Sequence, residues 1–315
     1  MMTNILFSPE FITELLVATI RMAIPLLLVA FGEMYSEKAG LVNIGLDGIM
    51  TVGALFGFLG TFYSGNPLIG ALFGIVAGII FNMIFAIMTV SLRSNQIVTG
   101  MALNILGPAV ATFIYRQAFG IQSSLEKVPL FQNVKIPLLG ELPFVGELLF
   151  NHNILVYFSY LLVVFSVIYF NKTKFGLNYI AVGEFPHAAE TLGINVMQKK
   201  YIACIICGAL SGLAGAYLTT SYISSYSDGI VAGRGFIGLA AVIFGRWKPV
   251  GVLLATVLFG FADALQLRLQ LINSDLPYQI LAMLPYLMTL FALIFFGRKN
   301  AGPKSNGKPY YKEAK

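Results

Sequence analysis

Residues 48–92 read GIMTVGALFGFLGTFYSGNPLIGALFGIVAGIIFNMIFAIMTVSL, and no Asp, Glu, Lys, Arg or His interrupts them. A helix needs about 20 apolar residues to cross the hydrocarbon of a bilayer, so this stretch is long enough for two crossings. Residues 201–227 and 277–297 form two further runs without a charged side chain. The sequence therefore predicts an all-α protein embedded in a membrane.

The composition of the whole chain agrees with this interpretation. Of the 315 residues, 57% are hydrophobic and only 11% are charged, whereas soluble domains carry about 25% charged residues. A membrane β-barrel would show short segments of alternating polarity instead of long apolar runs. The net charge of +6 is concentrated at segment ends and in the tail, without a basic groove of interleaved aromatic residues. We therefore expect the lipid bilayer, and no nucleic acid, as a partner.

Apolar runs predict where a polytopic chain crosses the membrane. The expected spans are residues 11–31, 40–62, 67–92, 96–119, 152–171, 200–221, 234–246, 249–268 and 277–297. The run at 234–246 is short for a full crossing, which leaves the predicted count at about eight to ten transmembrane helices.

The positions of Lys and Arg predict the orientation, because basic residues concentrate in cytoplasmic segments. We divide the chain into a transmembrane domain at 1–297 and a basic cytoplasmic tail at 298–315. A loop at about 172–199, flanked by lysines, is assigned to the cytoplasm, and the Pro- and Gly-rich acidic loop at about 120–151 to the outside. Residues 302–309, GPKSNGKP, resemble a phosphate-binding loop but lack its Ser or Thr, so a disordered tail is expected there.

The sequence also contains a weak internal repeat. The stretches NIGLDGIMTVGALFG (43–57) and NPLIGALFGIVAG (66–78) resemble FIGLAAVIFG (236–245) and KPVGVLLATVLFG (248–260). In the predicted topology the two copies run in opposite directions, as inverted repeats do in transporters whose pathway lies between the halves. Glycine-rich helices also resemble one another by composition alone, so both interpretations stay open. A true repeat would place the pathway near 43–47 and 235–238.

Several polar side chains fall inside apolar helices, where they are candidates for function. Asp47 and Asp263 could form the catalytic pair of an intramembrane aspartyl enzyme, line a polar path, or cap and pair within the bundle. A helix that begins just before Asp47 would place this carboxylate in its first turn. The further candidates for a translocation path are Asn43, inside the repeat, and Asn82 and Asn104, whose amides could instead bond between helices.

Residues 175–194, FGLNYIAVGEFPHAAETLGI, are too polar to cross a bilayer. Pro186 suits the first turn of a helix, and Gly193 suits a helix end. The stretch therefore predicts a short cytoplasmic helix that presents Ala188, Ala189 and Leu192 to a partner outside the bilayer. An amphipathic loop resting on the membrane surface is the alternative.

Four stretches, taken together, resemble a known family. They are RMAIPLLLVAFGEMYSEKAGLVNIGLDGIMTVGA (21–54), FGLNYIAVGEFPHAAETLGINV (175–196), GRGFIGLAAVIFGRWKPVG (233–251) and LPYLMTLFAL (284–293). They are similar to the permeases of ABC transporters for nucleosides and simple sugars, within the branched-chain amino acid/ribose permease superfamily, and most similar to the nucleoside branch. The resemblance spans nearly the whole chain in the same order.

The resemblance implies a permease subunit that forms half of the nucleoside pathway of an ATP-driven importer, or alternatively a permease for ribose-like sugars. It implies no catalysis and no metal or cofactor on this chain, because a separate ABC ATPase would use the ATP. The other implied partners are a second related permease and an external binding protein or lipoprotein, at the plasma membrane with the C-terminus in the cytoplasm.

By the same resemblance, residues 175–194 contain the coupling helix that docks into the ATPase. The residues that match this motif are Gly176, Gly183, Glu184, Ala188, Ala189 and Gly193. His187 stands where a basic residue is common in the family, so a charge contribution at this position is in doubt at neutral pH.

Overall fold

The computed structural model describes residues 9–120, 125–137, 139–142, 144–272 and 302–311, with isolated positions between 279 and 294. Within these residues, seven helices are long and apolar enough to cross a membrane. They are α2 (Pro9–Lys38), α3 (Leu46–Ser64), α4 (Pro67–Ala86) continued by the π-helix η1 (Ile87–Ser91), α5 (Gln96–Phe119), α7 (Ile154–Lys172), α10 (Val196–Tyr217) continued by the π-helix η3 (Leu218–Tyr222), and α12 (Pro249–Ile272). The predicted all-α membrane fold is confirmed.

The remaining elements are short. They are the 3-10 helix η2 (Leu139–Glu141), the helices α6 (Val145–Phe150), α8 (Lys174–Glu184), α9 (Pro186–Thr191) and α11 (Arg234–Phe244), and the strands β1 (Val134–Lys135) and β2 (Asn151–His152). The two strands pair antiparallel, with Val134 opposite His152.

Eight of the predicted spans coincide with helices, and the span predicted at 277–297 lies outside the continuously described residues. The second span was placed six residues too early: residues 40–45 form turns and extended chain, and α3 begins only at Leu46. The residues of this connector are as apolar as those of a helix, so composition alone cannot distinguish the two. The connector can be non-helical inside the bundle because side chains of other helices form hydrogen bonds with its backbone N–H and C=O groups. The short run at 234–246 is the 11-residue α11, about 16 Å long and thus half of a crossing.

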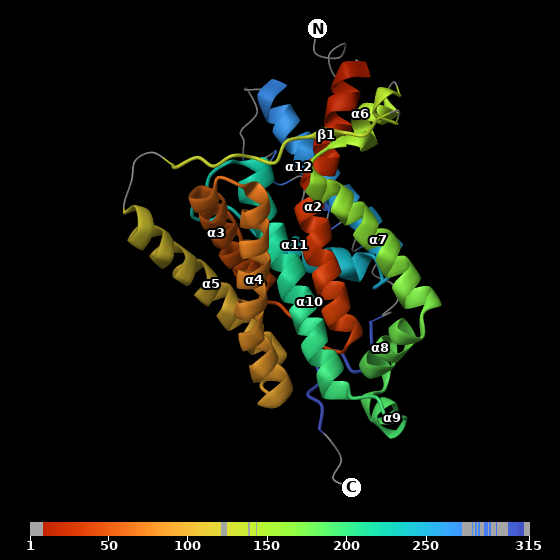
Figure 1. The fold of residues 1–315 in the computed structure, drawn as a ribbon. Coiled ribbons are helices and arrows are strands. Elements are labelled where there is room, and N and C mark those ends of the chain that lie inside the picture. Colours follow the sequence, from red (N-terminus) through yellow and green to blue (C-terminus); the bar gives the residue numbers. More distant parts are fainter. Residues whose placement is uncertain are drawn as a thin grey trace.

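Helix α2 is enclosed on all sides over most of its second half, residues 22–37. Six consecutive residues, Leu26 to Phe31, are at most 1% exposed. A helix with no exposed face belongs to the interior of a bundle, and Figure 1 shows α2 running between α10, α7 and α12. The position of α2 matters because both ends of this helix contact the regions described below.

The small residues of α10 let neighbouring helices approach closely. A Cβ atom added to Gly78 of α4 would lie 2.3 Å from the carbonyl oxygen of Gly208, and one added to Gly53 of α3 would lie 2.4 Å from that of Gly212. Only glycine fits at such contacts, and small residues provide the tight packing that holds membrane helices together.

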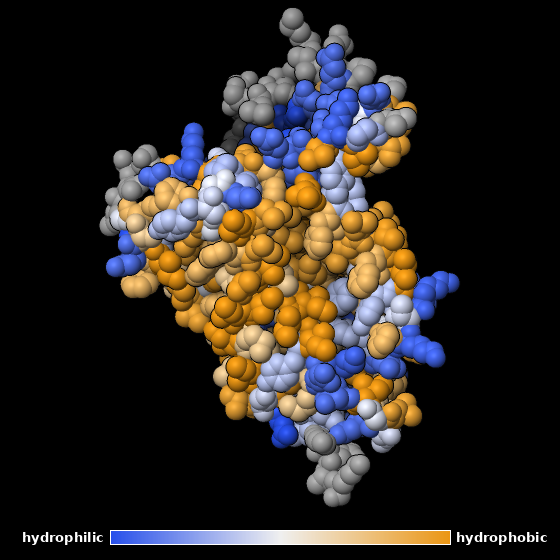
Figure 2. Space-filling model, in the orientation of Figure 1, coloured by the Kyte–Doolittle hydropathy of each residue, from blue (hydrophilic) through white to orange (hydrophobic). Residues whose placement is uncertain are grey.

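The outer surface separates into three zones. Apolar side chains form a broad band around the middle, and hydrophilic residues gather at both ends (Figure 2). On α4 the exposed side chains include Leu68, Leu72, Val76, Ile80 and Ile84, spaced four residues apart, which forms a lipid-facing stripe. We call the end that carries α6 and β1 in Figure 1 the upper end, and the end that carries α8 and α9 the lower end.

The upper end is covered by the segment between α5 and α7. The backbone N–H groups of Val128 and Phe131 donate to the carbonyl oxygens of Ser224 and Thr220, at 2.8 Å each. His152 is buried, and its Nε2–H donates to the carbonyl oxygen of Leu148 at 2.7 Å. Burial lowers the pKa of His152, so the imidazole is held neutral.

At the lower end, residues 302–311 follow a path of turns packed against α8, α9 and the end of α2. The prediction of disorder at 302–309 is therefore wrong. That prediction used only the local composition, whereas the segment is held by side chains distant in sequence: the hydroxyl of Tyr310 donates to Glu190, and Asn306 donates to Glu37.

Candidate functional site

The N-termini of α3 and α11 meet inside the bundle. The backbone N–H of Gly235, the second residue of α11, donates to Oδ1 of Asp47 at 3.0 Å. Asp47 itself lies in the first turn of α3. Its carboxylate is thus close to the positive ends of two helix dipoles, an arrangement that favours negative charge. The expected helix beginning just before Asp47 is present, and this carboxylate caps the neighbouring helix α11.

Arg234 lies beside the same meeting point. Its guanidinium donates to the carbonyl oxygens of Ile230 and Val231 at 3.2 Å each. A catalytic aspartate pair shares a proton between two adjacent carboxyl groups. Oδ1 of Asp47 accepts the backbone N–H of Gly235, which is the role of a cap within the bundle, and Asp263 lies half-buried on α12.

Asn43 and Asn82 are fully buried and bonded to each other. The Nδ2 of Asn43 donates to Oδ1 of Asn82 at 2.8 Å, and Nδ2 of Asn82 donates to the carbonyl oxygen of Cys204 at 2.6 Å. The backbone N–H of Asn43 donates to Glu33 on α2 at 2.8 Å. Asn82 lies roughly 14 Å above the lower end of α4 and η1 at 1.5 Å per residue, so the connector 39–45 returns deep into the bundle.

Asn104 of α5 holds the other side of this connector. Its Oδ1 accepts the backbone N–H of Gly48 at 2.9 Å, and its Nδ2 donates to the carbonyl oxygen of Ile44 at 2.6 Å. Asn104 is only half-buried, whereas Asn43 and Asn82 have no exposed surface. The structure therefore brings Asn43, Asn82 and Asn104 to one non-helical connector, which leads directly to Asp47.

At the lower end, α8 and α9 form the segment that the sequence singled out. Helix α9 begins at Pro186, as predicted. Ala188 is exposed and Leu192 is 80% exposed, as predicted. The prediction that Ala189 faces a partner is wrong, because Ala189 is 1% exposed and packs against Val182, Val196 and Tyr310. Phe185, between the two helices, is 55% exposed. The loop thus presents an apolar outer surface at the lower end, beyond the lysine-rich ends of the spanning helices.

The three glycines of this segment have different roles. A Cβ on Gly176 would lie 2.0 Å from the carbonyl oxygen of Tyr169 on α7, and one on Gly183 would lie 2.2 Å from that of Lys38 on α2. Gly193 has φ +81°, with no atom within 4 Å of an added Cβ. The first two glycines allow close packing, and the third allows a left-handed turn.

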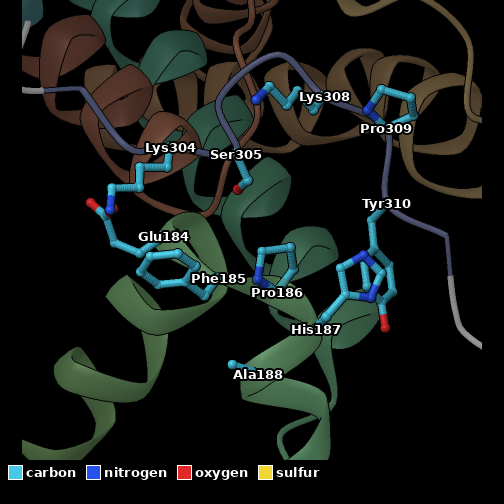
Figure 3. Close-up of a pocket in the computed structure, with 10 residues that line it drawn as sticks. All are labelled: Glu184, Phe185, Pro186, His187, Ala188, Lys304, Ser305, Lys308, Pro309 and Tyr310. Atoms are coloured by element: carbon cyan, nitrogen blue, oxygen red, sulfur yellow. The ribbon is translucent and has the colours of Figure 1, made fainter.

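Glu184 is the last residue of α8 and lines a groove of about 520 Å³ together with α9 and the C-terminal segment. Figure 3 shows Glu184, Phe185 and His187 on one side of this groove and Lys304, Lys308 and Tyr310 on the other. Negative and positive side chains therefore line the same surface.

The sequence alone did not predict helix α8 or the hydrogen bonds of Arg234. The signal for α8 was Thr173, whose Oγ1 accepts the N–H of Gly176 at 3.0 Å and so caps the helix start. The signal for Arg234 was a charged residue at the start of an apolar run, which in a membrane needs a partner. Tyr179 of α8 is buried, which raises its pKa well above the usual value, and its hydroxyl donates to the carbonyl oxygen of Tyr35 at 2.8 Å.

Three proteins that are similar to this chain are all named as permeases of ABC transporters. The chain is 38% identical to the guanosine ABC transporter permease protein NupQ of Bacillus subtilis, over 94% of this chain and 95% of NupQ. It is 36% identical to the nucleoside ABC transporter permease protein NupC of Lactococcus lactis, over 91% and 93% of the two chains. It is also 36% identical to the putative glucose ABC transporter permease protein TsgC13 of Haloferax volcanii, over 91% and 92%.

The resemblance noted from the sequence is confirmed. The family model described as "branched-chain amino acid transport system / permease component" matches residues 15–293. These relatives are transporter permeases and not enzymes, which removes the aspartyl-enzyme alternative, and permeases of ABC transporters act with ATPase and substrate-binding partners. With seven described helices able to cross a membrane, this chain is a multi-pass membrane protein that belongs to the branched-chain amino acid transport system permease family.

Proposed function

We propose that this chain forms half of the translocation pathway of an ATP-driven importer of nucleosides. The observation that carries the proposal is the identity of 38% and 36%, over more than nine-tenths of the chain, to permeases named for guanosine and nucleosides. The other half would be a second, related permease, and an external binding protein or lipoprotein would deliver the substrate.

The proposed pathway begins at the meeting point of α3 and α11. Helix N-termini that meet near mid-depth, next to non-helical backbone, are typical of substrate sites in transporters. Asp47 and Asp263 are half-buried, and Asp47 is bonded to the start of α11, so a small movement of α11 would alter the polar surface available to a substrate. Asn43, Asn82 and Asn104 would contribute by holding the connector that positions Asp47.

The proposed contact with the ATPase is the α8–α9 loop. Its exposed apolar residues, Phe185 and Leu192, would dock into the ATPase with Ala188 between them. Gly183 packs against the end of α2, so displacement of the loop would push directly on a helix of the bundle. ATP-driven closure of the ATPase subunits would in this way change the accessibility of the pathway, as a rigid-body movement.

We place the lower end in the cytoplasm and the protein in the plasma membrane. The basic residues Lys172, Lys174, Lys199, Lys248 and Lys304 lie at the lower end, and the acidic residues Glu126, Glu141 and Glu147 belong to the segment at the upper end. This distribution supports the assignment because cytoplasmic segments of membrane proteins are enriched in Lys and Arg. The C-terminal segment would then be cytoplasmic.

The test is uptake of radiolabelled guanosine, adenosine, uridine and cytidine by cells with and without the gene. We expect uptake that depends on the gene and on ATP, and that excess unlabelled nucleoside suppresses. Glucose and ribose serve as competitors, because the 36% identity to a putative glucose permease favours a sugar as the second candidate. Gene-dependent uptake of glucose or ribose without uptake of any nucleoside would replace the first proposal by the second.

A further inference from the structure

The C-terminal segment, residues 302–311, fills the inner side of α9. The hydroxyl of Tyr310 donates to the carboxylate of Glu190, and the Tyr310 ring lies 5.4 Å from the ring of His187. Tyr310 is 9% exposed and packs against Ala189 and the buried end of α8. Since α9 has six residues, fewer than a helix needs to be stable alone, this packing determines the position of α9.

The same segment is bonded to the end of α8. The backbone N–H and the hydroxyl of Ser305 both donate to the carbonyl oxygen of Gly183, the former at 3.0 Å. The Nζ of Lys304 lies 4.5 Å from the centre of the Phe185 ring, within the range of a cation–π interaction. Figure 3 shows Lys304 beside Glu184 and Phe185 on one side of the groove and Tyr310 beside His187 on the other, so the segment contacts the α8–α9 loop at two separated points.

The segment is also bonded to α2 and to the turn between α11 and α12. The Nδ2 of Asn306 donates to Oε2 of Glu37 at 2.6 Å, and Nε1 of Trp247 donates to the same oxygen at 2.7 Å. Gly302 packs against the Trp247 ring, 3.1 Å from the position of an added Cβ. Glu37 is 3% exposed, so these bonds are shielded from water and stronger than surface contacts.

Contacts continue from Glu37 towards the pathway. Glu33, one turn higher on α2, accepts the backbone N–H of Asn43 at 2.8 Å. The connector then leads to Asp47, which accepts the N–H of Gly235. A contiguous set of packed and hydrogen-bonded groups therefore joins α9 to the N-terminus of α11, which is the physical requirement for mechanical coupling between two sites.

We propose that residues 302–311 form a brace that makes the α8–α9 loop and the lower end of α2 move as one body. Tyr310 and Asn306 are its positioning residues: Tyr310 fixes the brace to α9, and Asn306 fixes it to Glu37. The brace rests on the proposed docking of the ATPase at the α8–α9 loop. Movement of α9 by the ATPase reaches the connector at Asn43 through the brace, in addition to the direct packing of Gly183 on α2.

The first measurement tests the brace without transport, by hydrogen exchange of the full-length permease in lipid nanodiscs. Tyr310→Phe removes the hydroxyl and keeps the ring, and we expect the amides of 187–192 to exchange about tenfold faster, because a hydrogen bond to a charged group is lost. Tyr311→Phe is the matched control, since Tyr311 is 55% exposed and stacks with Arg93 on the other side of the segment. Equal exchange of these amides in Tyr310→Phe and wild type overturns the brace.

The second measurement tests coupling in the complex with the partner ATPase in proteoliposomes. Asn306→Ala cuts the brace from Glu37 and leaves the Tyr310 contact intact. We expect the ATPase to remain bound and the nucleoside taken up per ATP hydrolysed to fall about two- to thirtyfold. An unchanged ratio overturns the role in coupling. Absence of ATP-driven uptake in the wild-type complex refutes the proposed function instead, and the exchange result still decides whether the segment holds α9.

Discussion

Gly193 offers a perturbation whose energetic cost comes from the backbone alone. The residue has φ +81°, and a Cβ placed on it would find no atom within 4 Å. Its N–H donates to the carbonyl oxygen of Glu190 at 2.9 Å, which closes the turn after α9. A larger side chain therefore has room, and any loss of function in Gly193→Ala must come from the left-handed conformation.

The magnitude follows from this conformation. An L-residue in the left-handed region costs about 1–2 kcal/mol, which corresponds to a roughly 5- to 30-fold smaller population of the native turn. Asn tolerates this region much better than Ala. We therefore expect Gly193→Ala to lower the nucleoside taken up per ATP hydrolysed by up to that factor, and Gly193→Asn to retain most of it.

The assay is ATP-driven uptake by the complex in proteoliposomes, with ATP hydrolysis measured in the same sample. Gly65 provides a matched control, because it has φ +68°, also with no atom within 4 Å of an added Cβ, and it lies in the α3–α4 turn at the other end of the bundle. Gly65→Ala carries the same backbone cost away from the α8–α9 loop and should leave uptake per ATP unchanged. The reasoning is refuted if Gly193→Ala and Gly193→Asn are equally impaired, or if Gly65→Ala is impaired as strongly as Gly193→Ala.

Three further predictions concern the bundle and the upper end. Asp47→Ala leaves the buried N–H of Gly235 without its acceptor, at a cost of about 1–3 kcal/mol; we expect impaired uptake with normal membrane insertion, and uptake equal to wild type would show that this contact does not matter. Gly78→Leu places a Cβ 2.3 Å from the carbonyl oxygen of Gly208 and should destabilise the protein by about 1–3 kcal/mol or more, seen as a lower melting temperature in detergent, whereas an unchanged melting temperature would contradict the packing. Burial lowers the pKa of His152, so the unfolded state binds the proton more readily than the folded state. The contribution to stability is therefore retained above the ordinary histidine pKa of about 6.5 and falls as the pH drops below it. Between pH 8 and pH 5 the melting temperature should fall less for His152→Gln than for wild type, and equal decreases would exclude this residue as the cause.

Much of the fold could be predicted from the sequence because its causes are local. The length of an apolar run decides whether a helix can span the bilayer, and this rule located eight helices of the described part. Pro186 and Gly193 act through their own backbone preferences, so the start of α9 and the turn after it followed from two residues. For Asp47 the sequence left two positions open, inside a helix at 40–62 or in the first turn of a helix that begins just before it, and α3 shows the second.

The rest depended on contacts between distant residues. Residues 40–45 of the connector were predicted to be helical because they are apolar, yet Asn82 and Asn104, on two other helices, supply hydrogen bonds that replace those of a helix. No local pattern shows that Asp47 would cap α11, because its contact residue Gly235 lies 188 residues later along the chain. That contact exists only once α3 and α11 are packed together.

The sequence by itself determined that this protein crosses a membrane and where its long apolar helices lie to within a few residues, because hydrophobic length is a property of single segments. Only the tertiary structure decided that residues 302–311 of the basic tail are ordered. Residues 302–311 contain two lysines and four residues of Gly or Pro, a composition that locally favours disorder. Their order comes from Glu37, Gly183 and Glu190, whose partners in the tail become available only when the folded bundle brings them together.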